Sequence, residues 1–470
     1  MRATFVLWVV LFSLPAIAGD FDEWATGQTL RVDYVHTGTA AEEHFALERL
    51  RVEGEWPGSR TQLLDTTNRG KYLVEVVDLA TNRLLYTRGF ASIYGEWETT
   101  GEARAGVWRA IPEAVRVPEP RKPVQLRIRK RQPDQSFEEV WGLTIDPASR
   151  FVDRAPVASY DWVALVDSGP AAIKADFVIL GDGYAASQKE KFVADAQRAT
   201  DALFRYDPFK ARKSDFNVRA VWTPAEHEGI SRPRAGIFRE SPLGARYNSF
   251  DSERYVLSLD DRAWRDAAAV VPYDFVLILV NERKYGGGGI FGLYSTAAID
   301  SGFYDYLVIH EFGHHFAGLG DEYYTSPVAY EEFGGGRVEP WEPNITALLD
   351  PENLKWRHMM EESTPLPTPW EKDAYEKRSR AYQKTRAEMR AAGAPEEDME
   401  ELFREGQAHF TKTLGEQEYS GKVGAFEGAI YEAQGLYRPS VDCIMFTRDE
   451  VGFCPVCDHA VTEIIDLYSK

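Results

Sequence analysis

The sequence contains 470 residues, of which 44% are hydrophobic and 27% are charged. This composition is typical of a globular chain of two or three domains, and it excludes both a disordered chain and a small disulfide scaffold. The formal net charge of −20 would repel the phosphates of nucleic acids and of anionic membranes, so neither is expected as the main partner.

The first eighteen residues have the pattern of a secretory signal peptide. Arg2 supplies the positive charge, residues 3–11 form a short apolar run, and Ala16-Ile17-Ala18 offers the small residues that a signal peptidase requires. No run elsewhere approaches the roughly 18 apolar residues of a membrane span. We therefore expect a secreted protein, periplasmic or extracellular, whose mature chain begins near Gly19 and has no transmembrane segment.

Residues 19–150 have the pattern of an all-β accessory domain. Short runs of alternating polar and apolar residues recur between turn-forming clusters. The clearest runs are Thr29–Val35, Gly70–Val77 and Val124–Arg129, and the turn clusters are Thr66–Gly70 and Pro118–Pro120. Closely spaced runs of period two, without a helical pattern, favour a β-sandwich. No chemistry-bearing cluster stands out, so we expect a packing or targeting module.

The pattern changes after about residue 150, where continuously apolar runs alternate with amphipathic segments. The apolar runs are Phe177–Leu180, Phe216–Trp222 and Phe275–Val280, and residues 187–205 have helical spacing. Buried strands between helices predict an α/β domain over residues 151–470. Residues 370–418 are rich in Glu, Lys, Arg and Ala around a central Gly-Ala-Pro, which predicts a helical-hairpin insertion. Its charges indicate a solvated face, or alternatively a cover that restricts entry of substrates to the active site.

The segment Tyr306–Tyr323 carries the chemistry. His310 and His314 are four residues apart, so on a helix they share one face and can offer two imidazole nitrogens to one Zn²⁺. Glu311 lies beside them, where a carboxylate can take a proton from a metal-bound water and pass it to the leaving amine. The alternative is a helix whose histidines bond only solvent or backbone, with Glu311 exposed.

A catalytic zinc needs a third protein ligand and leaves one position for water. Gly318 and Gly320 can end the helix and reverse the chain, which brings Asp321 or Glu322 towards the metal. Of these two we select Asp321. His315 follows a ligand directly and projects about 100° away round the helix, so it is expected to be a supporting or packing residue.

Together these motifs resemble the metzincin class of zinc peptidases, and specifically the M64 (immunoglobulin A peptidase) family. The matching runs are Val178–Tyr184, His310–Tyr323, Glu342–Thr346, Gly435–Ser440, Asp442–Met445 and Phe453–Cys457. The resemblance covers the chain from about Asp176 to the C-terminus, and the β-domain is similar to the accessory domain of such peptidases. It implies a metzincin-like catalytic domain that acts on protein or peptide substrates.

The chain departs from the metzincin pattern after the second histidine. Gly318 and Asp321 are each displaced by one residue, and Asp replaces the usual His. This departure keeps Glu322 open as the third ligand. The resemblance also implies a methionine turn beneath the zinc, and Met445 fits that position, where it would also act as core filler.

Two further segments are candidates for substrate contacts. In metzincins an edge strand before the zinc helix pairs with extended substrate, and Lys284–Tyr294, which contains four consecutive glycines, occupies that place. A flexible loop is the alternative. Tyr437 and Arg438 precede Met445 and are candidate donors to the oxyanion, although two packed surface residues would look the same in sequence.

The three cysteines all lie near the C-terminus, at Cys443, Cys454 and Cys457. In an exported protein they allow one disulfide and one free thiol, which favours a staple from Cys443 to one of the other two. The Cys-x-x-Cys spacing also suits a redox pair or half a zinc site, but a four-ligand site would need partners that the cysteine count barely provides.

The sequence therefore predicts a secreted zinc-dependent endopeptidase with His310, His314 and Asp321 as zinc ligands and Glu311 as general base. Two other functions remain open. One is a non-catalytic surface-binding protein that keeps the peptidase fold, and the other is a zinc amidase that acts on cell-wall peptide. Immunoglobulin cleavage does not follow from the motif, and the oligomeric state is not indicated.

Overall fold

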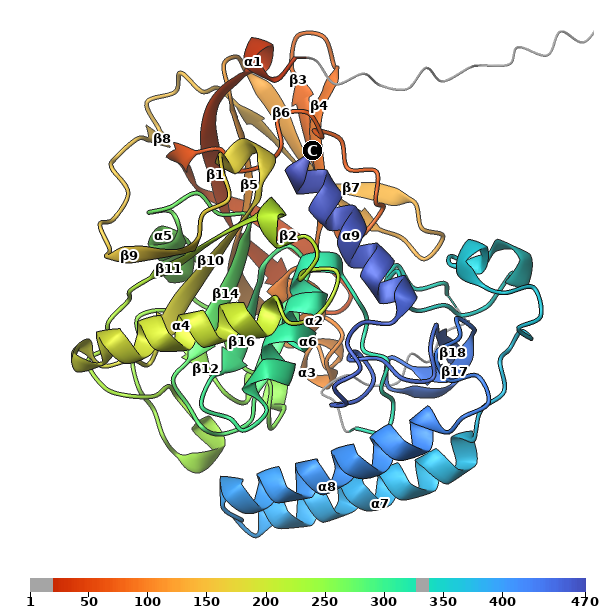
Figure 1. Ribbon diagram of the computed structural model, residues 1–470. Helices are drawn as coiled ribbons and strands as arrows, with labels where there is room; N and C mark the ends of the chain where they lie inside the picture. Colours follow the sequence, from red (N-terminus) through yellow and green to blue (C-terminus); the bar gives the residue numbers. More distant parts are fainter. Residues whose placement is uncertain (1–19, 327–337) are drawn as a thin grey trace, which may run out of the picture.

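A computed structural model describes residues 20–326 and 338–470 of the chain. The expected signal peptide at residues 1–18 lies outside the described residues. No helix within the described ranges is long and apolar enough to cross a membrane. Two four-stranded sheets come first along the chain, and a six-stranded sheet flanked by helices follows (Figure 1).

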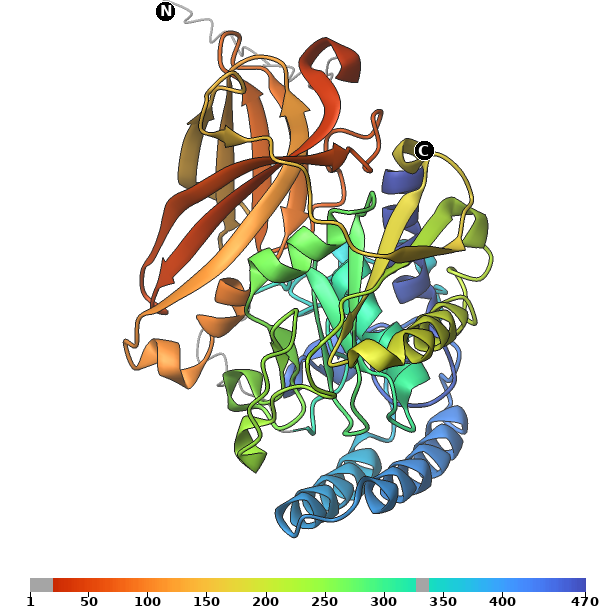
Figure 2. The same ribbon diagram turned by 90° about the vertical axis from the view of Figure 1, so that its left-hand side faces the viewer.

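The two four-stranded sheets face each other as a β-sandwich (Figure 2). In spatial order, one sheet contains β5 (Arg109–Pro120), β1 (Ala25–Gly38), β2 (Glu43–Glu55) and β8 (Val152–Asp153), and the other contains β4 (Leu84–Phe90), β3 (Tyr72–Asp78), β6 (Val124–Arg131) and β7 (Phe137–Ile145). Inward side chains from both sheets, such as Val32, Val76 and Leu126, share one buried core. The alternating pattern in the sequence therefore reflects strands with one face on this core.

Some details of the sandwich differ from the sequence expectation. The segment Pro118–Pro120 is the end of β5 and not a turn. Proline is tolerated there because β5 is an edge strand, whose open side needs no N–H. Three helices of four or five residues also occur, α1 (Phe21–Trp24), α2 (Ile93–Trp97) and α3 (Gly101–Arg104). Such short helices give no helical period in a sequence. Strand β8 pairs with β2 beyond residue 150, and the domain boundary at 150/151 stays a prediction.

The six-stranded sheet forms the centre of the second part of the chain. Its spatial order is β15 (Gly287–Ile290), β16 (Tyr294–Ala298), β14 (Phe275–Val280), β10 (Ala175–Asp182), β11 (Phe216–Val221) and β9 (Trp162–Val166). The four central strands run parallel, and the two edge strands run antiparallel to their neighbours. The flanking helices are α4 (Lys189–Leu203), α5 (Asp261–Ala268), α6 (Tyr304–Ala317) and α9 (Pro455–Ser469). A short ladder joins β12 (Ala245–Arg246) to β13 (Leu257–Ser258).

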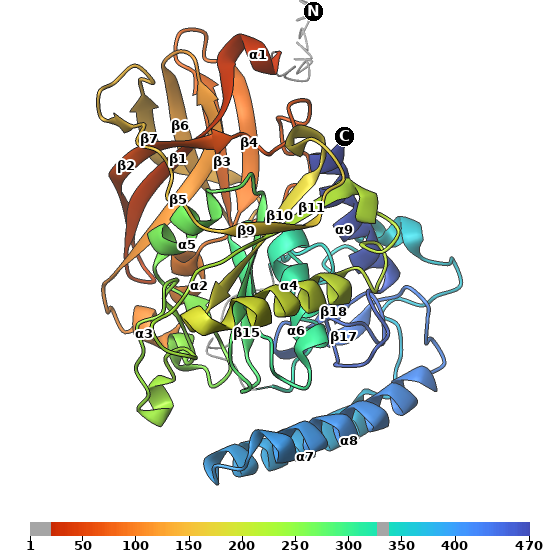
Figure 3. The same cartoon turned by 60° about the vertical axis from the view of Figure 1, so that its left-hand side comes forward.

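The two faces of this sheet pack against different layers. Phe177 and Ile179 of β10 belong to the core that contains α4, α6 and α9. Val178 and Leu180 belong to a second core, which includes Trp97 of the sandwich domain together with α5. Because side chains alternate along a strand, a continuously apolar strand needs an apolar layer on both faces. The sandwich domain therefore supplies part of one layer, and the helices supply the other (Figure 3).

Polar contacts also join the two domains. The Arg69 guanidinium is buried and donates to the carbonyl oxygens of Ala317 (3.2 Å) and Ala460 (2.7 Å), and it forms an ion pair with Glu463. These carbonyls belong to helices α6 and α9. A residue of the first domain thus holds the end of the helix that carries the histidine pair.

The C-terminal part adds a helix pair and a small hairpin. Helices α7 (Lys372–Ala391) and α8 (Glu396–Gly415) lie side by side at one edge of the molecule (Figure 1). Strands β17 (Phe426–Ala429) and β18 (Glu432–Arg438) form an antiparallel hairpin. The turn of this hairpin contacts the loop that follows α6.

Candidate metal centre and active site

The histidine pair lies on α6, which packs closely against the glycine-rich strand β15. A Cβ atom on Gly289 would lie 2.1 Å from the carbonyl oxygen of Glu311 and 2.9 Å from Cβ of His314. Only glycine therefore allows the strand to approach the helix this closely. The helix ends at Ala317, where Gly318 takes the left-handed conformation (φ 64°) and turns the chain back towards the histidines.

Three side-chain atoms converge at this turn. Nε2 of His310 and Nε2 of His314 are 3.2 Å apart, and Oδ1 of Asp321 lies 3.2 Å from each of them. A tetrahedral zinc with bonds of 2.0–2.1 Å separates its nitrogen and oxygen ligands by about 3.3 Å. The three atoms thus match the spacing of three zinc ligands.

The surroundings direct these atoms towards one another. Nδ1 of His310 lies 3.0 Å from the Ile444 carbonyl oxygen, and Nδ1 of His314 lies 2.5 Å from that of Leu319. A carbonyl accepts the ring N–H, so each Nε2 keeps a lone pair that faces the centre. A second carboxylate oxygen, Oδ2 of Asp321, accepts a hydrogen bond from another side chain, Tyr431. This set of donors fits a divalent cation.

Without a metal ion, the charged groups of the cluster shift one another's pKa values. Burial alone would lower the pKa of His314, but the Asp321 carboxylate outweighs it and raises the pKa to about 9. Burial would raise the pKa of Asp321, but the two histidines hold it well below its ordinary value. Burial raises the pKa of Glu311, against the opposing effect of the histidines. A base with a raised pKa accepts a proton more readily than an ordinary carboxylate.

The cluster faces a cavity of about 800 Å³ between the two domains. His310, Glu311, His314 and Asp321 contribute to its lining. Residues from the sandwich domain also line it, namely Lys71, Ala91, Ser92, Gly95, Glu96, Thr99, Arg104, Arg131, Gln132, Pro133 and Gln135. The first domain therefore packs against the six-stranded sheet and also forms part of the wall of the cavity. A targeting role stays a prediction.

Two predicted residues lie behind the helix. Met445 is fully buried, and its Sδ would be 3.1 Å from a Cβ placed on Gly313 of α6. His315 is fully buried, and its Nε2 accepts a hydrogen bond from the Val276 amide (3.0 Å) while Nδ1 contacts the Ile290 carbonyl oxygen (3.1 Å). His315 thus ties α6 to two strands of the sheet.

The structure does not bring Tyr437 and Arg438 to the cavity. Arg438 is fully buried, with its guanidinium 3.8 Å from the Phe446 ring centroid, and it donates to the carbonyl oxygen of Gly428 (2.9 Å). Tyr437 pairs through its backbone with Thr346. Neither residue is among the described residues that line the cavity. The position of Arg438 indicates a packing role inside the hairpin.

Sequence reasoning missed two side chains near the cluster. Tyr431 binds Asp321 from 110 residues further along the chain. Arg254 lines the cavity and donates to the Tyr323 hydroxyl (2.7 Å). No spacing rule connects such distant positions. The hairpin turn itself lacks a sequence signal, because Ile430 and Tyr431 adopt positive φ values (40° and 64°) without an Asn-Gly pair.

The structure contains no disulfide between the cysteines, which differs from the favoured expectation. Cys443, Cys454 and Cys457 are all buried free thiols. Sγ of Cys443 lies 3.9 Å from Sγ of Cys457, whereas a disulfide requires about 2.0 Å. Glu322 lies against these thiols and not against the histidine pair.

Comparison with protein families assigns both domains. Residues 163–465 match the model described as IgA Peptidase M64, and residues 20–142 match the model described as Peptidase M64 N-terminus. A search of curated proteins finds no match.

Proposed function

Because this chain belongs to the IgA peptidase M64 family, a family of peptidases, we propose that it is a secreted zinc-dependent endopeptidase. His310, His314 and Asp321 would hold Zn²⁺, and Glu311 would act as general base. The observation that carries the proposal is the mutual 3.2 Å separation of the three ligand atoms. Secretion is inferred from the signal peptide at residues 1–18.

In the proposed mechanism, different residues of the chain have different roles in peptide hydrolysis. When bound, the zinc ion supplies Lewis acidity and lowers the pKa of a coordinated water. Glu311 takes a proton from the attacking water and delivers it to the leaving amine. Arg254 and Tyr323 line the same cavity, where their hydrogen-bonding groups are available to the developing oxyanion. Tyr437 and Arg438 lack this access, which favours Arg254 over them.

Strand β15 offers a place for extended substrate. On its outer edge, Gly287 bonds the segment Arg254–Val256, and Phe291 accepts a hydrogen bond from Ala91. Alternate residues of a strand present their backbone groups to the same edge. Gly289 therefore presents its N–H and C=O between these two attachments, at the wall of the cavity. An extended peptide would pair with this edge and lie across the metal centre.

The finer assignments follow from this proposal. We propose a metzincin-like catalytic domain over residues 151–470, with residues 370–418 as a helical-hairpin insertion and Met445 in the methionine turn. The proximity of Asp321 to both histidines supports it as third ligand over Glu322. A non-catalytic binding protein would not require the general base Glu311. A cell-wall amidase shares the chemistry, and substrate preference separates it from an endopeptidase.

The decisive experiment compares Glu311→Gln with the wild type in a digest of a mixed peptide library, with and without a chelator. We expect the wild type to hydrolyse the library at least about 100-fold faster than Glu311→Gln, with full zinc content in both proteins, and we expect the chelator to stop hydrolysis. Glu352→Gln, at an exposed position, is the control. Undiminished turnover by Glu311→Gln would refute the mechanism. A wild type that cleaves added cell-wall peptide but no member of the library would favour the amidase.

A further inference from the structure

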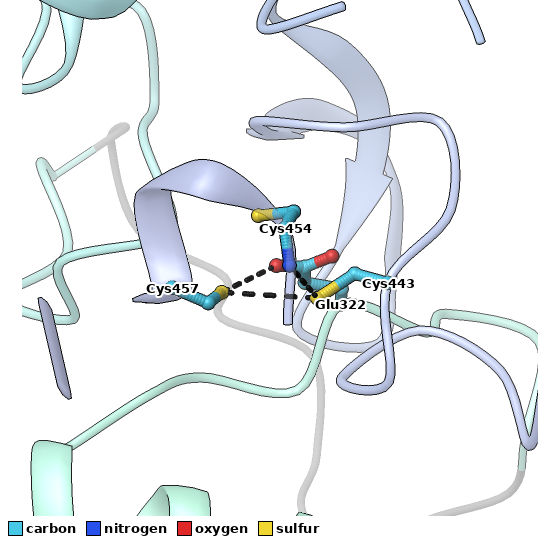
Figure 4. Close-up of side chains that lie close together, drawn as sticks. All are labelled: Glu322, Cys443, Cys454 and Cys457. Atoms are coloured by element: carbon cyan, nitrogen blue, oxygen red, sulfur yellow. Dashed lines mark hydrogen bonds between the residues drawn. The ribbon is translucent and has the colours of Figure 1, made fainter. Parts of the chain in front are cut away.

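A second group of metal-binding side chains lies beside the first. Glu322, Cys443, Cys454 and Cys457 each direct one oxygen or sulfur atom inward, and these four atoms all lie within 4.8 Å of one another. The side chains come from three separate segments, namely the loop after α6, the segment after β18 and the start of α9 (Figure 4). All four residues are buried.

The distances fit a metal ion better than a disulfide. Sγ of Cys443 and Sγ of Cys457 are 3.9 Å apart, and Sγ of Cys457 lies 3.4 Å from Oε1 of Glu322. Zinc–sulfur bonds of 2.3 Å in a tetrahedron place two sulfur atoms about 3.8 Å apart. Zinc–oxygen bonds are shorter, so a sulfur–oxygen edge is shorter too, as observed here.

Glu322 supplies an independent sign of a missing partner. Its side chain is fully buried, and its Oε2 has no hydrogen-bond partner in the described part of the chain. Oε1 accepts a hydrogen bond from Nδ2 of Asn344 (2.9 Å), which fixes the orientation of the carboxylate. No Lys or Arg among the described residues forms an ion pair with it. A buried carboxylate in such a place is costly unless a cation compensates it.

Two backbone features near the thiols favour negative charge on sulfur. The amide of Cys454 donates to Sγ of Cys443 (3.3 Å). Cys454 is also the N-cap of the fifteen-residue helix α9, and Pro455 follows at its first position. A helix N-terminus stabilises negative charge on sulfur. Cys454 and Cys457 thus arrive at the cluster from one rigid turn.

We propose that Glu322, Cys443, Cys454 and Cys457 bind a second Zn²⁺, which has a structural role. Four protein ligands complete a tetrahedron and leave no position for water, which is typical of structural zinc. This proposal does not depend on the peptidase mechanism. An effect of this zinc on the peptidase site would rest on the proposed function. Such an effect is expected because Glu322 follows Asp321 directly, and the Ile444 carbonyl that contacts His310 follows Cys443.

The test begins with the metal content of the full-length mature protein, purified without chelator. We expect two zinc ions per chain in the wild type and one in His314→Ala. Cobalt substitution of His314→Ala should then give a thiolate-to-cobalt charge-transfer band. A wild type that holds no sulfur-bound metal, with three titratable thiols or the intact mass of a disulfide form, would overturn the proposal.

Ligand variants separate this site from the peptidase site. Cys457→Ser and Glu322→Gln should each lower the zinc content from two to one while His314→Ala retains its remaining ion. If Cys457→Ser fails to fold, the cobalt spectrum of His314→Ala decides alone. If the wild type holds a single zinc that survives in His314→Ala and has sulfur ligands, the cysteine site is supported and the peptidase zinc is contradicted. If that single zinc is lost in His314→Ala, the peptidase zinc is supported and the cysteine site is contradicted.

Discussion

The Tyr431 hydroxyl donates a hydrogen bond to Oδ2 of Asp321. Because one carboxylate oxygen is held in this way, the other stays directed at the histidine pair, 3.2 Å from each Nε2. The turn that carries Tyr431 is fixed to the same loop by its backbone, since the Ile430 amide donates to the Asp321 carbonyl oxygen (2.9 Å). Positive φ at two bulky residues costs free energy, and the contacts with the Asp321 loop hold the turn in place.

Removal of this hydroxyl should weaken metal binding. Tyr431→Phe keeps the ring and deletes the hydroxyl that donates to Oδ2, so Asp321 gains rotational freedom. Loss of such a supporting hydrogen bond typically costs 10–100-fold in metal affinity. Competition with a chromophoric chelator measures the affinity directly, and Tyr160→Phe, at an exposed position, is the control. Equal zinc affinity in both variants would show that the Tyr431 contact does not position the ligand.

Substitution of the two neighbouring acids should affect two different metal ions. Asp321→Asn keeps the size of the side chain but removes the charge, so we expect the peptidase site to lose at least about 100-fold in zinc affinity and activity to fall accordingly. Glu322→Gln should leave the histidine-bound zinc in place. Zinc analysis after dialysis distinguishes the two variants. If Glu322→Gln lacks the histidine-bound ion, Glu322 and not Asp321 is the third ligand.

The sequence predicts the candidate site best where its geometry is local. His310, Glu311 and His314 lie within two turns of one helix, and the glycines after it return the chain to the histidine pair within seven residues. Periodicity and helix geometry suffice for such a motif. The same reasoning located the buried strands, because a strand covered on both faces reads as a continuous apolar run.

Other parts of the site depend on tertiary contacts that no local pattern encodes. The wall of the cavity includes Arg131 and Gln135 from the sandwich domain, which reach it only after the domains pack together. From the sequence, Glu322 is a rival ligand for the histidines, whereas the fold turns it towards cysteines more than 100 residues away. The disulfide expectation differs from the structure for the same reason, since the cysteine spacing does not show that Glu322 lies among three free thiols.

The domain interface gives a prediction about stability. Arg69→Ala would leave the carbonyl oxygens of Ala317 and Ala460 without their buried donor and would remove the arginine that pairs with Glu463. We expect a loss of roughly 2–4 kcal/mol in the free energy of unfolding. Urea unfolding measures it, and Arg83→Ala, at an exposed position, is the control. An unchanged stability would mean that the domains do not support each other through this contact.

A single methyl group on β15 should disturb the active site. In Gly289→Ala the new Cβ would meet the Glu311 carbonyl oxygen at 2.1 Å, so the strand must move away from α6. We expect lower thermal stability and at least a tenfold loss of activity, because Glu311 and His314 both lie at this contact. Gly54→Ala, where no atom lies within 4 Å of the added Cβ, should change neither property. Wild-type activity in Gly289→Ala would refute the close-packing argument.

The last prediction concerns the pH dependence of stability through His315. Burial lowers the pKa of His315 to about 3, whereas the unfolded chain has a histidine pKa near 6.5. Between these two values the unfolded state binds more protons, so the free energy of unfolding falls as the pH falls below 6.5. The loss of unfolding free energy that His315 causes is nearly complete at pH 3 and amounts to roughly 4 kcal/mol.

A variant without a titrating group isolates this effect. In His315→Gln the amide can still accept from Val276 and donate to Ile290, the two backbone partners of the imidazole. Urea unfolding of both proteins in excess chelator, at several pH values from 7 to 4, removes the contribution of metal release. We expect the stability of the wild type to fall more steeply with acidification than that of His315→Gln. Parallel curves would mean that His315 is protonated in the folded protein, which contradicts its buried position between α6 and the sheet.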